Sequence, residues 1–146
     1  MQRIEFRTVR GNPAANTVVD AVVPYLGSVS LPDFLRRIER PSATRDGQPE
    51  LAGNYLGLNA EHVGWPSRHY LGEPVLSWFG DGDTVLLGCV CGDWGCWPFT
   101  AVVTVERDAV TWSRYRHGHR DWDYTGLWDL VFDRTQYQEA LEATAR

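Results

Sequence analysis

Residues 84–116 read TVLLGCVCGDWGCWPFTAVVTVERDAVTWSRYR, and this stretch decides the fold. Three of its segments, 84–91, 99–106 and 110–116, are rich in Val, Thr and aromatic residues and are separated by short runs that contain Gly, Asp or Arg. Segments of this composition predict β-strands. Because the connections are short, successive strands are expected to pair antiparallel.

Shorter strands are expected on both sides of this stretch. Residues 4–8 alternate apolar and charged side chains, as in a half-buried strand. The β-branched run 17–23 is expected to pair with them across a turn at 11–13 and to be ended by Pro24 and Gly27. The remaining predicted strands are 74–79 and 130–132.

Two helices are predicted from capping boxes, in which two side chains three residues apart bond to each other's backbone amides. Ser30 and Asp33 open the first helix, where apolar residues recur at helical spacing. We expect Glu39 and the arginines of this helix to face water and Pro41 to end it. Asp133 and Gln136 open the second helix, at the C-terminus.

The segment 41–74 has no clear period and is rich in Pro and Gly. It also contains many Leu, Tyr and Trp residues, so we expect it to pack on the core. Together these patterns predict a single α+β domain over residues 1–146. It would have one antiparallel sheet of about five to seven strands, two short flanking helices and this long irregular segment.

The composition of the chain excludes several functional classes. Apolar residues make up 43% of the 146 residues, which is enough for a packed core, and the net charge of −5 argues against binding to DNA or to an anionic membrane. All 14 cationic residues are arginine, which excludes Schiff-base lysines and a P-loop. The sequence shows no membrane-spanning apolar run and no signal-peptide pattern, so we expect a cytoplasmic protein with reduced thiols.

The three cysteines of the chain, Cys89, Cys91 and Cys96, fall within eight residues. If residues 92–95 form a four-residue loop, Cys91 faces Cys96, Cys89 faces Pro98, and all three thiols share one side of the hairpin. The cluster is one ligand short of a closed zinc site and has one thiol too many for a disulfide.

Three interpretations of this cluster stay open. The thiols pack without reacting, or they bind zinc with His69 as the fourth ligand, or Cys91 or Cys96 is a nucleophile with His69 as its base. The backbone amides of 92–95 would then form an anion-binding nest. The other histidines considered as neighbours of the thiols are His62, His117 and His119.

Trp94 and Trp97 form an aromatic pair on the same hairpin. A tryptophan at a hairpin tip either folds back onto its own chain or anchors a partner. Arg68 and His69, in the irregular segment, are expected to lie beside this pair and to complete a recognition surface.

Residues 114–120 are the most concentrated positive stretch, and aromatic side chains are interleaved with its Arg and His residues. Such a pattern can stack on and clamp single-stranded nucleic acid. Because Asp121 and Asp123 follow at once and the chain is acidic, we favour a solvated turn with internal ion pairs, and nucleic acid is not an expected partner.

The run 86–98, with its pattern C-x-C-G-x-x-G-C-W-P, resembles a family of small proteins from high-GC bacteria that has no established activity. Residues 66–72 and 131–141 are similar to other recurrent stretches of that family. The resemblance implies no catalytic residue, but it links the 66–72 loop with the thiol hairpin.

The favoured hypothesis is a small non-catalytic binding protein whose Cys- and Trp-rich hairpin, with or without zinc, recognises a protein or a small ligand. One alternative is a thiol-dependent enzyme that uses Cys91 or Cys96 with a histidine base. Another is a binder of single-stranded nucleic acid through residues 114–120.

Overall fold

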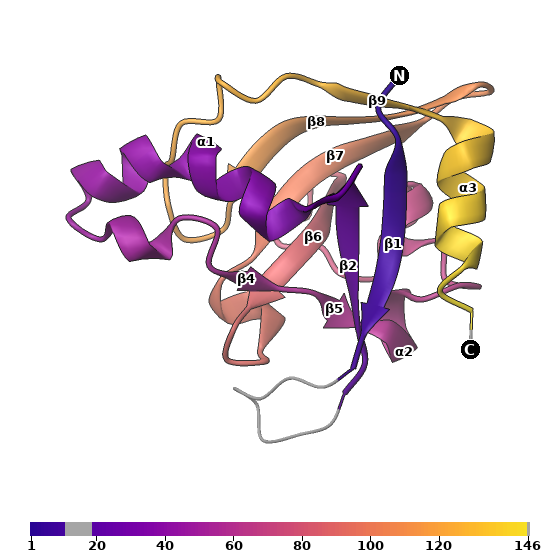
Figure 1. Cartoon of the computed structure of the whole chain (residues 1–146), viewed down its shortest axis with the longest axis horizontal. Coiled ribbons are helices and arrows are strands. Elements are labelled where there is room, and N and C mark those ends of the chain that lie inside the picture. The colour runs from indigo at the N-terminus through magenta and orange to yellow at the C-terminus, as the bar shows by residue number, and fades with distance from the viewer. Residues whose placement is uncertain (11–18, 146) are drawn as a thin grey trace.

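The computed structural model describes residues 1–10 and 19–145, and its larger sheet is built on the stretch 84–116 (Figure 1). Three successive antiparallel strands lie at its centre: β6 (Asp83–Cys89), β7 (Phe99–Val105) and β8 (Ala109–His117). The edges are β4 (Tyr55–Leu56) and β9 (Leu130–Asp133), which give the order β4-β6-β7-β8-β9. These strands confirm the predictions for 84–91, 99–106, 110–116 and 130–132 to within a few residues.

A second sheet is built around β2 (Ala21–Leu26), which pairs antiparallel with β1 (Ile4–Val9). Its other edge pairs with β3 (Val29–Ser30) at one end and with β5 (Leu58–Asn59) at the other. The predicted α+β class with antiparallel strands is confirmed, but the strands form two sheets instead of one.

Two strand predictions need correction, and one lies partly outside the described residues. The turn at 11–13 and residues 17–18 of the run 17–23 are not among the described residues. β2 continues through Pro24 and ends at Leu26, directly before Gly27, the other residue expected to end it. Pro24 is tolerated because it falls between the residues that pair with β5 and those that pair with β3, where no partner strand needs its missing amide. Residues 74–79 form no strand and instead bend around the side chain of Asp83.

The helix α1 (Leu31–Arg45) starts where the capping box predicts, with the Ser30 hydroxyl accepting from the Asp33 amide. Contrary to the prediction, it does not end at Pro41 but includes it and runs one turn further. Glu39 is the second correction, since its side chain is buried and not solvated.

After the end of α1, the irregular segment contains short elements in this order: η2 (Pro49–Leu51), strands β4 and β5, α2 (Ala60–Val63) and η3 (His69–Leu71). Its buried residues confirm that it packs on the core. The C-terminal helix α3 (Arg134–Glu142) is capped by Asp133, whose carboxylate accepts from the Gln136 amide, as the second capping box predicts.

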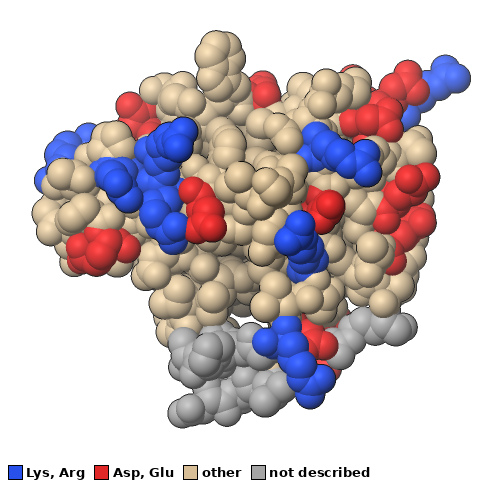
Figure 2. Space-filling view, viewed as in Figure 1, with Lys and Arg blue, Asp and Glu red and all other residues tan. Residues whose placement is uncertain are grey.

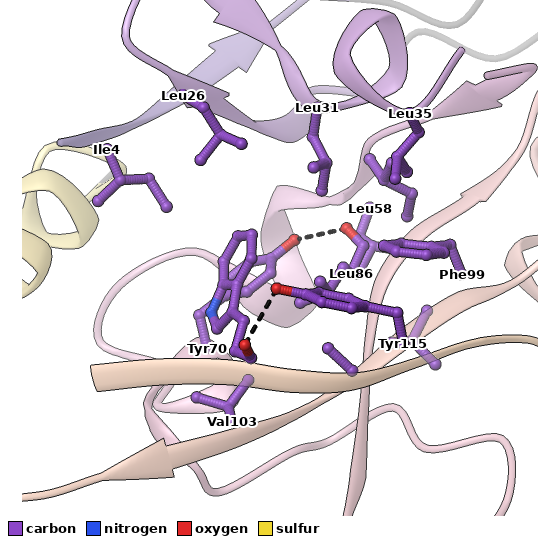
Figure 3. Packing of buried hydrophobic residues seen from close by; sticks show 14 of the residues in the cluster. Ile4, Leu26, Leu31, Leu35, Leu58, Tyr70, Leu86, Phe99, Val103 and Tyr115 are labelled. Atoms are coloured by element: carbon purple, nitrogen blue, oxygen red, sulfur yellow. Dashed lines mark hydrogen bonds between the residues drawn. The ribbon is translucent and has the colours of Figure 1, made fainter. Parts of the chain in front are cut away.

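The core lies between the two sheets and is closed by α1 and α3 (Figures 1 and 3). Figure 3 shows Leu26, Leu31 and Leu35 pointing towards Tyr70 and Leu86. The buried Tyr70 hydroxyl donates to the Leu86 carbonyl at 3.3 Å, so this polar group of the core is satisfied.

Charges of both signs are mixed on the face seen in Figure 2, where arginines gather over α1 with carboxylates beside them. The exposed arginines of this helix are Arg36, Arg37, Arg40 and Arg45. Within residues 1–10 and 19–145, no helix has the length and apolar character needed to cross a membrane.

Candidate functional site

The loop before β6 is held by one buried carboxylate. Asp83 accepts from the Ser77 hydroxyl and from the amides of Trp78, Phe79 and Gly80 at 2.5–3.1 Å. Burial alone would raise the pKa of Asp83, but these hydrogen bonds hold the pKa below its ordinary value. The loop is thereby fixed with Trp78 at the surface, where 38% of the residue is exposed.

The cysteine hairpin differs from the predicted ribbon. The β6–β7 ladder ends at the pair Leu87–Phe99, and Cys89 pairs with Tyr55 of β4 and does not face Pro98. The tip contains the short helix η4 (Trp94–Cys96). The Asp93 carboxylate caps it by accepting from the Gly95 amide at 3.1 Å.

The three thiols nevertheless lie together, with Cys91 between the other two. Its sulfur is within hydrogen-bonding reach of the thiols of both Cys89 and Cys96, and it accepts from the Asp93 amide at 3.4 Å. Cys91 and Cys96 are exposed, whereas Cys89 is partly buried, and none of the three forms a disulfide.

Trp94 folds back onto its own hairpin. A Cβ atom on Gly88 would lie 2.8 Å from the Cα atom of Trp94, so this approach requires glycine at position 88. On its other side the Trp94 ring meets the edge of Trp78, with ring centroids 6.3 Å apart. The tip is therefore tied to the loop that Asp83 holds.

The turn after β8 packs against the same tip. His119 Nε2 donates to the Gly95 carbonyl at 2.9 Å, and its ring lies 4.8 Å from that of Trp78. Trp78 Nε1 in turn donates to the Gly118 carbonyl at 3.1 Å. Three chain segments that are distant in sequence therefore meet at one surface.

This meeting point contains an open hollow of about 650 Å³, which we call the tryptophan hollow. It is lined by Trp78, Asp93, Gly95, Cys96, Trp97, His119 and Arg120. On the other side of the hairpin lies a more enclosed hollow of about 140 Å³, lined in part by Leu58, His62, Gly88, Cys89 and Trp94. The hairpin thus separates two concave surfaces and contributes side chains to both.

Behind the tryptophan hollow, the Trp97 ring packs between buried His117 and the guanidinium of Arg120. The His117 Nδ1 atom accepts from the His119 amide at 3.0 Å. Burial, with the nearby charges of His119 and Arg120, lowers the pKa of His117 to about 3, so the ring is neutral. In the part of the chain that the structure describes, Trp97 Nε1 and His117 Nε2 have no hydrogen-bond partner.

His69 and Arg68 do not join the hairpin surface. His69 is fully buried, its Nε2 donates to the Val85 carbonyl at 2.7 Å, and its Nδ1 accepts from the Val75 amide at 3.1 Å. A ring with both nitrogens engaged cannot serve as a base, a metal ligand or a surface for a partner. Arg68 is exposed and forms an ion pair with Glu73.

The positive stretch 114–120 is largely engaged within the protein. Arg116 forms two hydrogen bonds to Asp81 and stacks on the Phe79 ring at 3.9 Å. Because Arg120 covers Trp97 and His117 is buried, few of these cations face outwards to meet a phosphate backbone.

Across residues 1–10 and 19–145, no group of three or more His, Cys, Asp or Glu side chains is arranged to hold a metal ion. The zinc interpretation of Cys89, Cys91, Cys96 and His69 stays a prediction from sequence and gains no support from this geometry.

Another surface, which the sequence did not indicate, is an apolar hollow of about 520 Å³ between α1 and the loop before β9. Trp128, on its rim, is 83% exposed. A tryptophan in a turn-rich segment carries no sequence signal of exposure. Because Trp128 lies on a different surface from the tryptophan hollow, it can serve as a control position in binding experiments.

Comparisons of this chain with protein-family models, with curated proteins and with solved structures find no match. The resemblance of the cysteine run to a family of small bacterial proteins therefore stays a prediction.

Proposed function

We propose that this chain is a small non-catalytic binding protein that recognises another protein through the tryptophan hollow. The observation that carries the proposal is the convergence of the 89–97 hairpin, the Asp83-held loop and the turn after β8 on this one surface. Tryptophan side chains fixed at an open surface are typical anchors of protein interfaces.

The chemistry of the hollow favours a partner that offers an apolar or aromatic side chain. The indole rings of Trp78 and Trp97 supply apolar contact area, while the Asp93 carboxylate and the Arg120 guanidinium supply a polar rim. An open, shallow hollow suits an inserted side chain better than an enclosed substrate. We place this interaction in the cytoplasm, where the exposed thiols of the hairpin stay reduced.

A thiol-dependent enzyme fits the geometry less well. Both nitrogens of His69 are engaged in the core, and the His119 nitrogen nearest the hairpin donates to the Gly95 carbonyl. A donating nitrogen cannot take a proton from Cys96, so the nucleophile–base pair that such an enzyme needs is not supported.

The proposal is tested with peptides that are selected from a random phage-displayed library for binding to the full chain. We expect Trp78→Ala and Cys96→Arg to weaken the binding of selected peptides at least about tenfold, measured by fluorescence anisotropy of labelled peptide. Cys96→Arg fills the hollow without removing a packed group, and thermal melting checks that both variants fold.

Trp128→Ala is the matched control, because it removes an exposed tryptophan from a different surface. Its binding should stay within about twofold of the parent protein. Peptides that lose affinity only in Trp128→Ala, or that bind all three variants equally, would contradict the proposal.

A further inference from the structure

The Cys91 sulfur lies between those of its two neighbours, while the Cys89 sulfur in turn accepts from the Cys91 amide at 3.4 Å. It is exposed, it accepts a hydrogen bond from the Asp93 amide at 3.4 Å, and the thiols of Cys89 and Cys96 can both donate to it. Each of these donors stabilises a negative charge on sulfur.

The surroundings of the three thiols shift their pKa values in different directions. The Asp93 amide and the thiols of Cys89 and Cys96 lower the pKa of Cys91. Contact with the Cys91 sulfur raises the pKa of Cys96 to about 11, and burial raises that of Cys89. The surroundings of Cys91 therefore favour its ionised form, whereas those of Cys89 and Cys96 favour the protonated thiol.

We propose that Cys91 is a peroxide-reactive thiol and that Cys96 resolves the product into a Cys91–Cys96 disulfide. The Cys91 thiolate attacks one oxygen of a hydroperoxide, the O–O bond breaks, and the released alkoxide or hydroxide leaves as alcohol or water after taking a proton from solvent. Cys91 is then a sulfenic acid. The Cys96 sulfur attacks the Cys91 sulfur, the S–O bond breaks, and hydroxide leaves as water with the Cys96 proton. Two thiols have then supplied the two electrons that reduce one peroxide.

Cys96 is a better resolving thiol than Cys89. Cys96 is exposed on η4, beyond a turn that already brings it to Cys91. Cys89 is held in register with Tyr55 and lies only two residues from Cys91 along the chain.

This chemistry goes beyond the proposed binding function and does not depend on it. A new bond to Cys96 alters η4, which also contains Trp94 and Gly95 of the two hollows. Peptide binding and thiol oxidation are measured separately, so either can fail alone.

The test is to treat the full reduced protein with one equivalent of hydrogen peroxide at pH 7, to alkylate free thiols and to analyse it by mass spectrometry. Cleavage before aspartate separates Cys91 from Cys96, because Asp93 lies between them. We expect a cross-linked Cys91–Cys96 peptide pair that dithiothreitol reverses, with Cys89 alkylated. Cys91 should also alkylate at least about tenfold faster than Cys96.

Serine variants assign the roles. Cys96→Ser should accumulate a Cys91 sulfenic acid that dimedone traps, and Cys91→Ser should form no disulfide. Cys89→Ser should still form the Cys91–Cys96 disulfide, because a serine hydroxyl can also donate to the Cys91 sulfur. A disulfide to Cys89, an equal reaction rate at all three thiols, or a rate no faster than that of the urea-unfolded chain would overturn the proposal.

Discussion

At the scale of single residues, burial determines which histidines are held neutral and which lie at the surface. His69 and His117 are both almost completely buried, and burial lowers their pKa values to about 4 and about 3. His119, which is exposed, is the histidine that lines the tryptophan hollow. The sequence offered four candidate histidines near the thiols and favoured His69. It could not indicate that His69 is buried, because the side chains that bury it come from distant segments.

The low pKa of His69 predicts how stability depends on pH. The unfolded chain takes up this proton near pH 6.5, whereas the folded chain takes it up only near pH 4. Between these values the unfolded state binds more protons, so the free energy of unfolding falls as the pH falls, by roughly 3 kcal/mol in all. Urea unfolding at pH 7.5 and pH 4.5 should show a smaller loss in His69→Gln than in the parent protein. An equal loss in both proteins would show that His69 is not held neutral by burial.

At the scale of secondary-structure elements, a buried carboxylate ties α1 to two other segments. Glu39 Oε1 accepts from the Gly53 amide at 2.8 Å, and Oε2 accepts from the hydroxyls of Tyr55 and Tyr124 at 2.5 Å each. Burial raises the pKa of Glu39, although the three hydrogen bonds act in the opposite direction. The helix is thereby joined to β4 and to the loop before β9.

Glu39→Met should destabilise the protein by about 2–4 kcal/mol, because it leaves two buried hydroxyls and one amide without their acceptor. Arg40→Met changes the next, exposed residue of the same helix and should alter stability by less than about 0.5 kcal/mol. Urea unfolding at pH 7 compares the two variants. Equal stabilities would mean that the Glu39 contacts do not hold α1 in place.

The sequence predicted where the helices begin better than where α1 ends, and the reason is physical. The capping boxes at Ser30 and Asp133 act within four residues, so the sequence alone contains the whole signal. The end of α1 and the absence of a strand at 74–79 depend on contacts made across the fold. Asp83, which bends that segment, lies four residues beyond its end, and no local pattern in the sequence indicates this role.

At the scale of the whole molecule, the sequence predicted the fold class and the clustering of the thiols but not the shape of the site. Local patterns indicated antiparallel strands, yet the division into two sheets depends on where β5 returns to β2. The tryptophan hollow combines Trp78, the 93–97 tip and His119, which no sequence spacing relates.

The most direct test of the account is to locate the binding site of a selected peptide by NMR, from the indole N–H signals in a ¹⁵N–¹H correlation spectrum. The chain has seven tryptophans, and each signal can be assigned by substituting one tryptophan at a time. If the tryptophan hollow is the recognition surface, the signals of Trp78 and Trp97 should shift on titration, while those of Trp112, in the core, and Trp128, on the other hollow, stay in place. A titration that shifts Trp128 and leaves Trp78 and Trp97 unchanged would contradict the account.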